Sequence, residues 1–227
     1  MWPRFRFVGR LGPADVVTVA NASLGFVAAV LAATAPDLAA RLVLLAAIAD
    51  ALDGILARRY GGTPAGPYLD ALADVSSFGV TPALLVAHRA AAVWPWSSSP
   101  ALRALGTALP ALFVVAAVVR LGLYTAYDSD EAGTRGVQTT LAATVLAAGV
   151  LAGFVTTPIL VGLAGLLAVL MLTRIPYPDL HPQDALVMGF VQAAAVVSRG
   201  WIGRGFAYAL LFLALAYLLL APRYYWA

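Results

Sequence analysis

The chain contains no cysteine and no lysine, and only two histidines, His88 and His181, among its 227 residues. The lack of cysteine excludes disulfides, zinc–thiolate sites and cysteine nucleophiles. Two histidines are too few for a metal site built on imidazole. Charged residues make up only 11% of the chain, and every basic one is arginine. The net charge of +3 fits contact with anionic lipid headgroups and gives little support to nucleic-acid binding.

Apolar residues dominate what is present, since 62% of the chain is hydrophobic. This composition predicts an all-α, polytopic membrane helical bundle rather than a soluble domain. An interfacial N-terminal segment of alternating basic and aromatic residues is expected at 1–12. We expect about eight transmembrane helices, at residues 14–34, 38–59, 67–87, 101–127, 136–155, 159–173, 185–197 and 206–220.

Four carboxylates interrupt this apolar pattern at Asp50, Asp53, Asp70 and Asp74. A charge inside a membrane segment costs about 2.5–3.5 kcal/mol or more, so it marks a functional site by default. Asp50 and Asp53 are three residues apart and Asp70 and Asp74 four apart, which places each pair on one helix face. Four acids repel one another unless a cation lies among them. Oxygen ligands of this kind suit hard cations such as Mg²⁺ or Mn²⁺.

The link between the two acidic pairs, residues 60–67, contains three glycines and two prolines. Such a stretch ends one helix and begins the next, so a tight reversal is predicted to bring the acidic faces together. Gly54 and Gly66 would let a ligand approach the backbone closely. Arg58 lies about one turn beyond Asp53 and is suited to holding a phosphate.

These residues follow the pattern D-x-x-D-G-x-x-A-R, seven residues, then G-x-x-x-D-x-x-x-D, which resembles the signature of the CDP-alcohol phosphatidyltransferase family. The resemblance implies a six-helix core at 13–180, with additional C-terminal helices at 181–227, and a homodimer. It implies that an alcohol displaces CMP from a CDP-linked lipid in the presence of two divalent cations, Mg²⁺ or Mn²⁺. Asp50, Asp53 and Asp70 would hold one metal.

By the same resemblance, Asp50, Asp70 and Asp74 would hold the second metal, and Asp74 would also act as general base. The nucleotide and its phosphates would be lined by Asp53, Gly54, Ala57, Arg58, Thr63 and Gly66.

Three stretches resemble the CDP-lipid:serine branch of the family. LDALADVSSFGVTPA at 69–83 resembles LDSLADxxSFGxAPA, with departures at Ala71 and Thr81. LMLTRIPYP at 170–178 resembles LM-x-S-R-I-P-Y-P, and Thr18-x-x-Asn21 resembles a pattern of the first span, although Asp15 replaces an asparagine found in many relatives. The resemblance implies L-serine as acceptor, and the Ala- and Arg-rich character resembles archaeal members that use CDP-archaeol.

The candidates for holding serine or phosphates are Ser76, Ser77, Arg120 and Arg174, with Asn21 as a further candidate. Each also has an ordinary interpretation. A helix hydroxyl often bonds its own backbone, and an arginine near a helix end often extends to the membrane interface. Arg120 departs most from that pattern because it lies well inside an expected span.

Two other functions stay open at this level. The same chemistry with glycerol phosphate or inositol phosphate would need extra cations near the site. A cation-coupled transporter would use the acids as a relay. The arginines number eight on the N-terminal side and five on the other, which favours a cytoplasmic N-terminus. We therefore expect a plasma-membrane protein whose acidic site faces the cytoplasm, where nucleotide-activated substrates are made.

Overall fold

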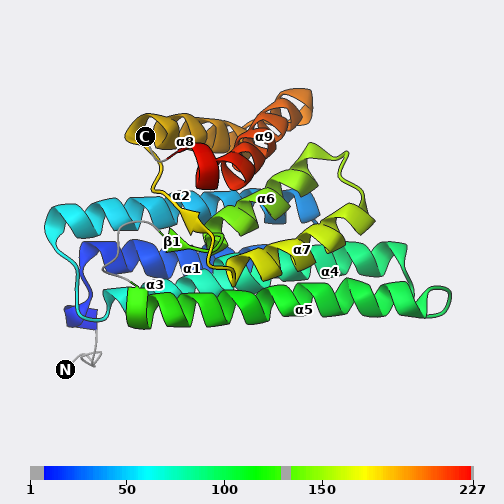
Figure 1. Cartoon of the computed structure of the whole chain (residues 1–227), viewed down its shortest axis with the longest axis horizontal. Coiled ribbons are helices and arrows are strands. Elements are labelled where there is room, and N and C mark those ends of the chain that lie inside the picture. The colour runs from blue at the N-terminus through cyan, green and yellow to red at the C-terminus, as the bar shows by residue number, and fades with distance from the viewer. Residues whose placement is uncertain (1–7, 129–133, 226–227) are drawn as a thin grey trace, which may run out of the picture.

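The computed structural model describes residues 8–128 and 134–225. Within these ranges the chain folds into eight long helical segments that pack together, with one short two-stranded sheet (Figure 1). The predicted all-α bundle is confirmed, and a helix lies at each of the eight expected spans. The first half begins with η1 (Val8–Arg10), α1 (Pro13–Leu31) and α2 (Pro36–Tyr60). One continuous helix follows, made of α3 (Gly66–Asp74), η2 (Val75–Val80) and α4 (Thr81–Val93). A second continuous helix is made of α5 (Pro100–Leu123) and η3 (Tyr124–Asp128). The second half comprises β1 (Thr134–Arg135), α6 (Thr139–Ala152), α7 (Thr157–Met171), β2 (Pro176–Tyr177), α8 (Pro182–Val197) and α9 (Gly200–Tyr224).

Four helices in the described ranges are long and apolar enough to cross a membrane: Pro13–Leu31, Gly66–Val93, Pro100–Tyr127 and Gly200–Tyr224. The apolar helices α6, α7 and α8 are shorter, and α2 has 25 residues but carries several charged side chains. The expected interfacial segment at 1–12 lies mostly outside the described residues. The division of the chain at residue 180 stays a prediction.

Proline and glycine set many of the helix boundaries. Proline occupies the first or second position of α1, α2 and α3, where its fixed φ suits a helix and its missing N–H costs nothing. Gly153 follows α6 in a left-handed conformation with φ 79°, which glycine adopts without a steric penalty. The chain therefore encodes short reversals between apolar helices.

The helix α6 lies at the centre of the bundle, and all of its residues except Thr140 are buried. In contrast, Ala195 alone is buried in α8. Figure 1 shows α8 and α9 stacked over α2 and α6, with α5 along the opposite side of the molecule. The C-terminal pair α8–α9 thus packs onto an assembled bundle.

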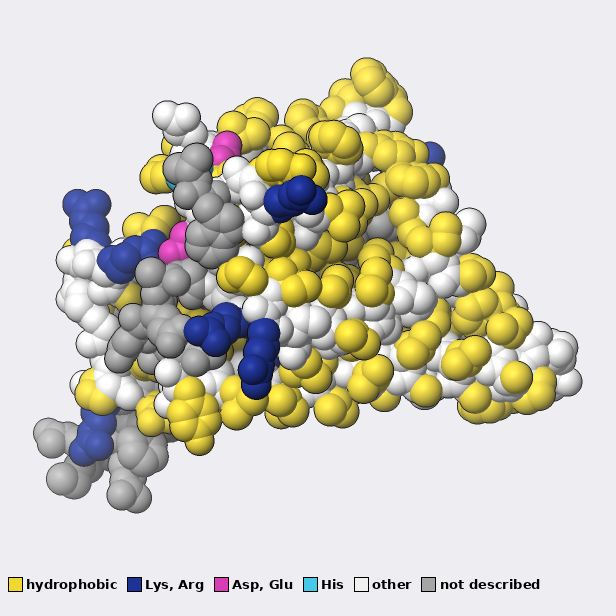
Figure 2. All heavy atoms as spheres, in the orientation of Figure 1, with side chains coloured by type: hydrophobic (Ala, Val, Ile, Leu, Met, Phe, Trp, Pro, Cys, Tyr) yellow, Lys and Arg dark blue, Asp and Glu magenta, His cyan; other side chains and the backbone are white. Residues whose placement is uncertain are grey.

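The surface shows where such a bundle meets lipid and water. Hydrophobic side chains cover most of the face in Figure 2, while basic and acidic side chains gather mainly over the end that holds α3 and β1. Exposed apolar side chains follow the length of α1 and α5, including Phe26 and Val115. The charged end of the bundle is therefore the place to look for a site.

Candidate functional site

Three of the four acids predicted from the sequence form a cluster at this charged end. Carboxylate oxygens of Asp50, Asp70 and Asp74 all lie within 4.8 Å of one another. The helical spacing puts Asp70 and Asp74 on one face of α3, and the reversal after α2 turns that face toward Asp50. The reversal begins at Gly61, whose φ of 86° is a conformation that side-chain-bearing residues rarely adopt.

Asp53 is held slightly apart from the other three acids. It is buried, and its carboxylate accepts a 2.7 Å hydrogen bond from the hydroxyl of Thr18 on α1. The hydroxyl of Thr140, at the start of α6, lies 3.4 Å from a carboxylate oxygen of Asp50. Hydroxyls from two other helices therefore orient the acidic side chains of α2, as outer-shell groups orient the ligands of a metal.

The cluster has the chemistry of a site for a hard cation. Oδ1 of Asp74 is buried and has no hydrogen-bond partner among the described residues. An unpaired carboxylate oxygen beside two further carboxylates is unfavourable in apolar surroundings unless a cation is bound. All the donor atoms are oxygens, which suits Mg²⁺ or Mn²⁺. The residues present therefore fit a divalent metal ion.

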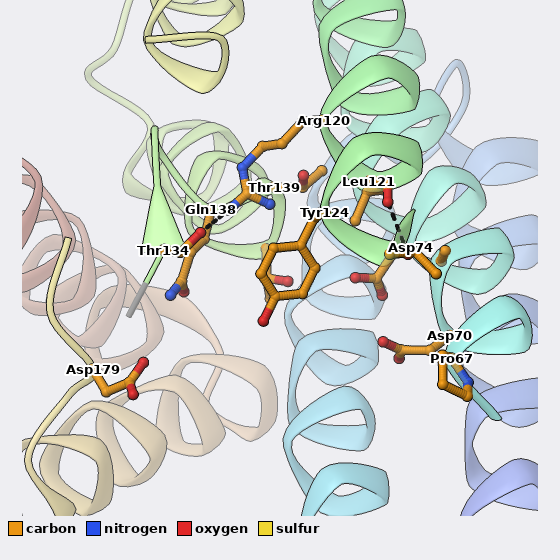
Figure 3. Close-up of a pocket in the computed structure, with 13 residues that line it drawn as sticks. Pro67, Asp70, Asp74, Arg120, Leu121, Tyr124, Thr134, Gln138, Thr139 and Asp179 are labelled. Carbon is orange, nitrogen blue, oxygen red and sulfur yellow. Dashed lines mark hydrogen bonds between the residues drawn. The ribbon is translucent and has the colours of Figure 1, made fainter. Parts of the chain in front are cut away.

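A cavity of about 260 Å³ opens beside this cluster. Figure 3 shows Asp70 and Asp74 on one side, Tyr124 in the middle, and Arg120, Thr134 and Gln138 on the other side. A side-chain nitrogen of Arg120 donates a 2.7 Å hydrogen bond to the hydroxyl of Thr134. The full lining is Pro67, Asp70, Ala71, Asp74, Arg120, Leu121, Tyr124, Thr125, Thr134, Gln138, Thr139, Thr140 and Asp179.

The lining also contains a second buried polar atom that lacks a hydrogen-bond partner within the described part of the chain. The hydroxyl of Thr139, at the first position of α6, has no hydrogen-bond partner among the described residues. Buried hydroxyls in proteins are nearly always paired. Thr139 and Asp74 therefore give the cavity two polar atoms that a bound ligand can satisfy, one on each of two helices.

Three of the residues expected to line a nucleotide, Gly54, Ala57 and Arg58, lie further along α2, toward its C-terminal end. Gly54 and Arg58 are neighbours on that helix, since a Cβ added to Gly54 would lie 3.4 Å from a guanidinium nitrogen of Arg58. Ala57 is half-buried beside them, and Arg58 is exposed. They surround the C-terminal end of α2, so an anion bound there would be close to Asp53.

Thr63 and Gly66 face α1 rather than open water. The hydroxyl of Thr63 donates a 2.8 Å hydrogen bond to buried Asp15, and the same carboxylate accepts a 2.7 Å bond from the backbone N–H of Gly12. A Cβ at Gly66 would lie 3.4 Å from Asp15. Asp15 thus ties the start of α1 to the link between α2 and α3.

The residues suggested to bind the acceptor do not all lie at the cavity. Arg120 lines the cavity, whereas Ser76, Ser77 and Arg174 do not. Ser77 is fully buried and donates a 2.9 Å hydrogen bond to the carbonyl of Asn21 on α1. Arg174 is exposed beyond the end of α7. The roles suggested for Ser76, Ser77 and Arg174 stay predictions.

Asn21 is fully buried, and neither its amide nitrogen nor its amide oxygen has a hydrogen-bond partner among the described residues. It lies one helical turn from Thr18, which contacts Asp53. Its suggested role also stays a prediction.

A π-helical turn follows Asp74 directly, at Val75–Val80. The N–H of Thr81 bonds the carbonyl of Ser76 in the wider π register, and the Thr81 hydroxyl donates to that carbonyl (2.8 Å) and to the carbonyl of Gly25 (2.9 Å). Such single π turns occur often at functional sites. Here the turn lets one helix present Asp74 to the cluster and Ser77 to α1.

Sequence reasoning missed several residues of the site, including Thr140, Gln138, Tyr124 and Asp179. The run Gln138-Thr139-Thr140 was a usable signal, because three polar residues open an otherwise apolar span. Tyr124 and Asp179 gave no local signal. They reach the cavity only because the ends of α5 and β2 meet there.

Known proteins are similar to this chain over much of its length. The family described as CDP-alcohol phosphatidyltransferase matches residues 12–175. Archaetidylserine synthase of Methanothermobacter thermautotrophicus is 28% identical over 175 residues, which are 75% of this chain and 71% of that protein. The CDP-diacylglycerol–serine O-phosphatidyltransferases of Mycobacterium bovis and Mycobacterium tuberculosis are each 36% identical over 96 residues, covering 42% of this chain and 30% of theirs. The family match extends from the start of α1 past the end of α7 and includes all four acids, so this chain belongs to the CDP-alcohol phosphatidyltransferase family.

Proposed function

We propose that this integral membrane enzyme transfers a phosphatidyl-type group, in particular an archaetidyl group, from a CDP-activated lipid to the hydroxyl of L-serine and releases CMP. The observation that carries the proposal is the convergence of Asp50, Asp70 and Asp74 at a cavity that also contains Arg120. The names of the relatives support serine as acceptor. The resemblance of the stretch at 69–83 to the serine branch also supports it.

Two divalent cations, Mg²⁺ or Mn²⁺, belong to this proposal. Asp50, Asp53 and Asp70 would hold one, and Asp50, Asp70 and Asp74 the other. When bound, the cations would neutralise the charge of the pyrophosphate that separates the lipid from CMP. Gly54, Ala57, Arg58, Thr63 and Gly66 would line the nucleotide, with Arg58 contributing a charge-assisted hydrogen bond to a phosphate.

Asp74 is the proposed general base. Its Oδ1 is buried and unpaired among the described residues, and the residue lines the cavity in which an acceptor would bind. A carboxylate in this position can take the proton of the serine hydroxyl as that oxygen attacks phosphorus. The proton would then leave with solvent through the same cavity, and CMP would depart from the opposite side of the phosphorus.

Arg120 is the proposed partner of the serine carboxylate. The Thr134 hydroxyl fixes the position of its guanidinium, and a guanidinium is well matched to a carboxylate. Among the described residues that line the cavity, Arg120 is the sole Lys or Arg. Glycerol phosphate and inositol phosphate carry a phosphate group, and Arg58, Arg59, Arg135 and Arg174 lie outside the lining. The cavity therefore favours serine over those acceptors.

The family match favours phosphotransfer over a cation-coupled transporter.

We further propose that the enzyme is a homodimer in the plasma membrane with the acidic site on the cytoplasmic side. The excess of arginine on that side supports the orientation. CDP-lipids carry a nucleotide made in the cytoplasm, so the orientation and the chemistry agree.

The test is CMP release by the purified protein. We expect release from CDP-archaeol or CDP-diacylglycerol when L-serine and Mg²⁺ or Mn²⁺ are present, and none in excess chelator. Glycerol, glycerol 3-phosphate and inositol 1-phosphate serve as competing acceptors under the same conditions. Faster release with either phosphate than with serine would overturn the proposed acceptor, and full turnover in chelator would overturn the two-metal site.

A further inference from the structure

One acidic side chain of the cavity belongs neither to the metal cluster nor to the part of the chain that the family match covers. Asp179 follows β2 and lines the cavity together with Arg120, whereas the family match ends at residue 175. Figure 3 shows its carboxylate directed toward the cavity from the side away from Asp70 and Asp74. Asp179 lies outside the three-carboxylate cluster, and it is an exposed side chain that lines the cavity.

The two-stranded sheet connects Arg120 to the backbone segment that carries Asp179. Arg120 bonds the hydroxyl of Thr134 in β1, and Thr134 pairs with Tyr177 in β2. Asp179 comes two residues after Tyr177. Arg120 and Asp179 thus lie along the same wall of the cavity, with Thr134 and Gln138 between them in Figure 3.

The C-terminal helix α9 fixes the backbone on which Asp179 sits. The hydroxyl of Tyr177 donates a 3.1 Å hydrogen bond to the carbonyl of Leu218, and the hydroxyl of Tyr217 donates to the carbonyl of Pro178. Both tyrosines are buried, with ring centroids 6.1 Å apart. These contacts hold both residues that precede Asp179, so α9, which lies beyond the family match, helps to position this wall of the cavity.

We propose that Asp179 binds the ammonium group of the acceptor while Arg120 binds its carboxylate. This inference rests on the proposed function and extends it, because it makes the cavity selective for a zwitterionic hydroxy amino acid. Serine carries both charges, and its hydroxyl is then left to face Asp74. The same aspartate repels phosphate-bearing acceptors, so it discriminates against them as well as attracting serine.

The test is Asp179→Asn, which keeps the size of the side chain and removes its charge. CMP release is measured with L-serine and with glycerate, which has the same terminal hydroxyl and carboxylate but a second hydroxyl in place of the ammonium. Losing one charge-assisted hydrogen bond should raise the KM for serine about 10- to 100-fold. The kcat at saturating serine and the KM for CDP-lipid should change less than about twofold, and the preference for serine over glycerate should fall by the same 10- to 100-fold.

Asp37→Asn is the matched control, since Asp37 is an exposed acid in the first turn of α2, far from the cavity. An unchanged KM for serine in folded Asp179→Asn would overturn the inference and leave the proposed function intact. An equal loss of activity with serine and glycerate would also overturn it, because that pattern indicates a structural role. Failure of the unmodified enzyme to use serine would overturn the proposed function and this inference together.

Discussion

The two ends of α2 carry charged side chains whose surroundings differ. At one end, Arg41 donates hydrogen bonds to the carbonyls of Ala195 (2.6 Å), Val196 (2.8 Å) and Ser198. These carbonyls end α8, where a cation also suits the helix dipole. Toward the other end, Asp50, near the middle of the helix, lies among further carboxylates, and an oxygen of Asp74 has no partner among the described residues.

This comparison distinguishes Arg41, a charged side chain that stabilises the fold, from the acidic side chains that are candidates for function. Arg41 closes the end of a helix, and Gln192 adds a 2.8 Å bond from α8 to the carbonyl of Leu44, so this end of α2 secures α8 to the bundle. Among the described residues, Oδ1 of Asp74 has no donor, and the three carboxylates could hold a cation. A membrane-embedded charge thus indicates function when the fold leaves it short of partners.

The largest effect is expected at the acidic end, from Asp74→Asn. The substitution keeps one oxygen and the size of the side chain, and it removes the proposed base. General-base catalysis contributes about 10²–10⁴-fold, so CMP release with serine should slow at least about a hundredfold. CDP-lipid binding should survive, which equilibrium binding to the purified variant checks. Near-normal CMP release by the folded variant would mean that another group accepts the proton.

A smaller effect is expected from Thr18→Val, which removes the hydroxyl that orients Asp53 without changing the side chain's shape. Loss of an outer-shell partner typically lowers metal affinity 10- to 100-fold. The Mn²⁺ concentration for half-maximal CMP release should therefore rise about tenfold or more, with activity recovering at saturating Mn²⁺. Thr107→Val is the matched control, because the Thr107 hydroxyl bonds only the carbonyl of Arg103 in its own helix. An unchanged Mn²⁺ requirement would show that the hydrogen bond from Thr18 to Asp53 does not affect metal binding.

The smallest effect on activity is expected at the other end of α2, from Arg41→Gln. Asp50 lies nine residues along the helix, roughly 14 Å away, so the site should be undisturbed. Losing hydrogen bonds to a charged group costs about 1.5–3 kcal/mol, which corresponds to a fall in Tm of about 3–12 °C. Thermal unfolding in detergent measures this, with the exposed Arg204→Gln as control. A large loss of kcat with an unchanged Tm would contradict the structural role of Arg41.

The proximity of three of the four acids follows in part from the sequence, because the spacing of residues within one helix is a local property. Residues three or four apart share a helix face in any helix, so the spacing pairs Asp50 with Asp53 and Asp70 with Asp74. The reversal between α2 and α3 then brings Asp70 and Asp74 to Asp50. The separate position of Asp53 was not predictable, because it depends on the hydroxyl of Thr18 arriving from α1. The position of Ser77 against Asn21 likewise depends on the π turn that follows Asp74.

By itself the sequence determined the eight helices, their approximate limits and the acids that face one another, because hydrophobicity, proline and helical period act over short stretches. The tertiary structure decided which helix lies at the centre. α6 and α8 have similar length and apolar character, yet one is buried and the other exposed. Lipid is as apolar as leucine, so hydrophobicity cannot distinguish a lipid-facing helix from a central one. The tertiary structure also brought Arg120, Gln138 and Asp179 to one cavity, because only packing joins the ends of α5, α6 and β2.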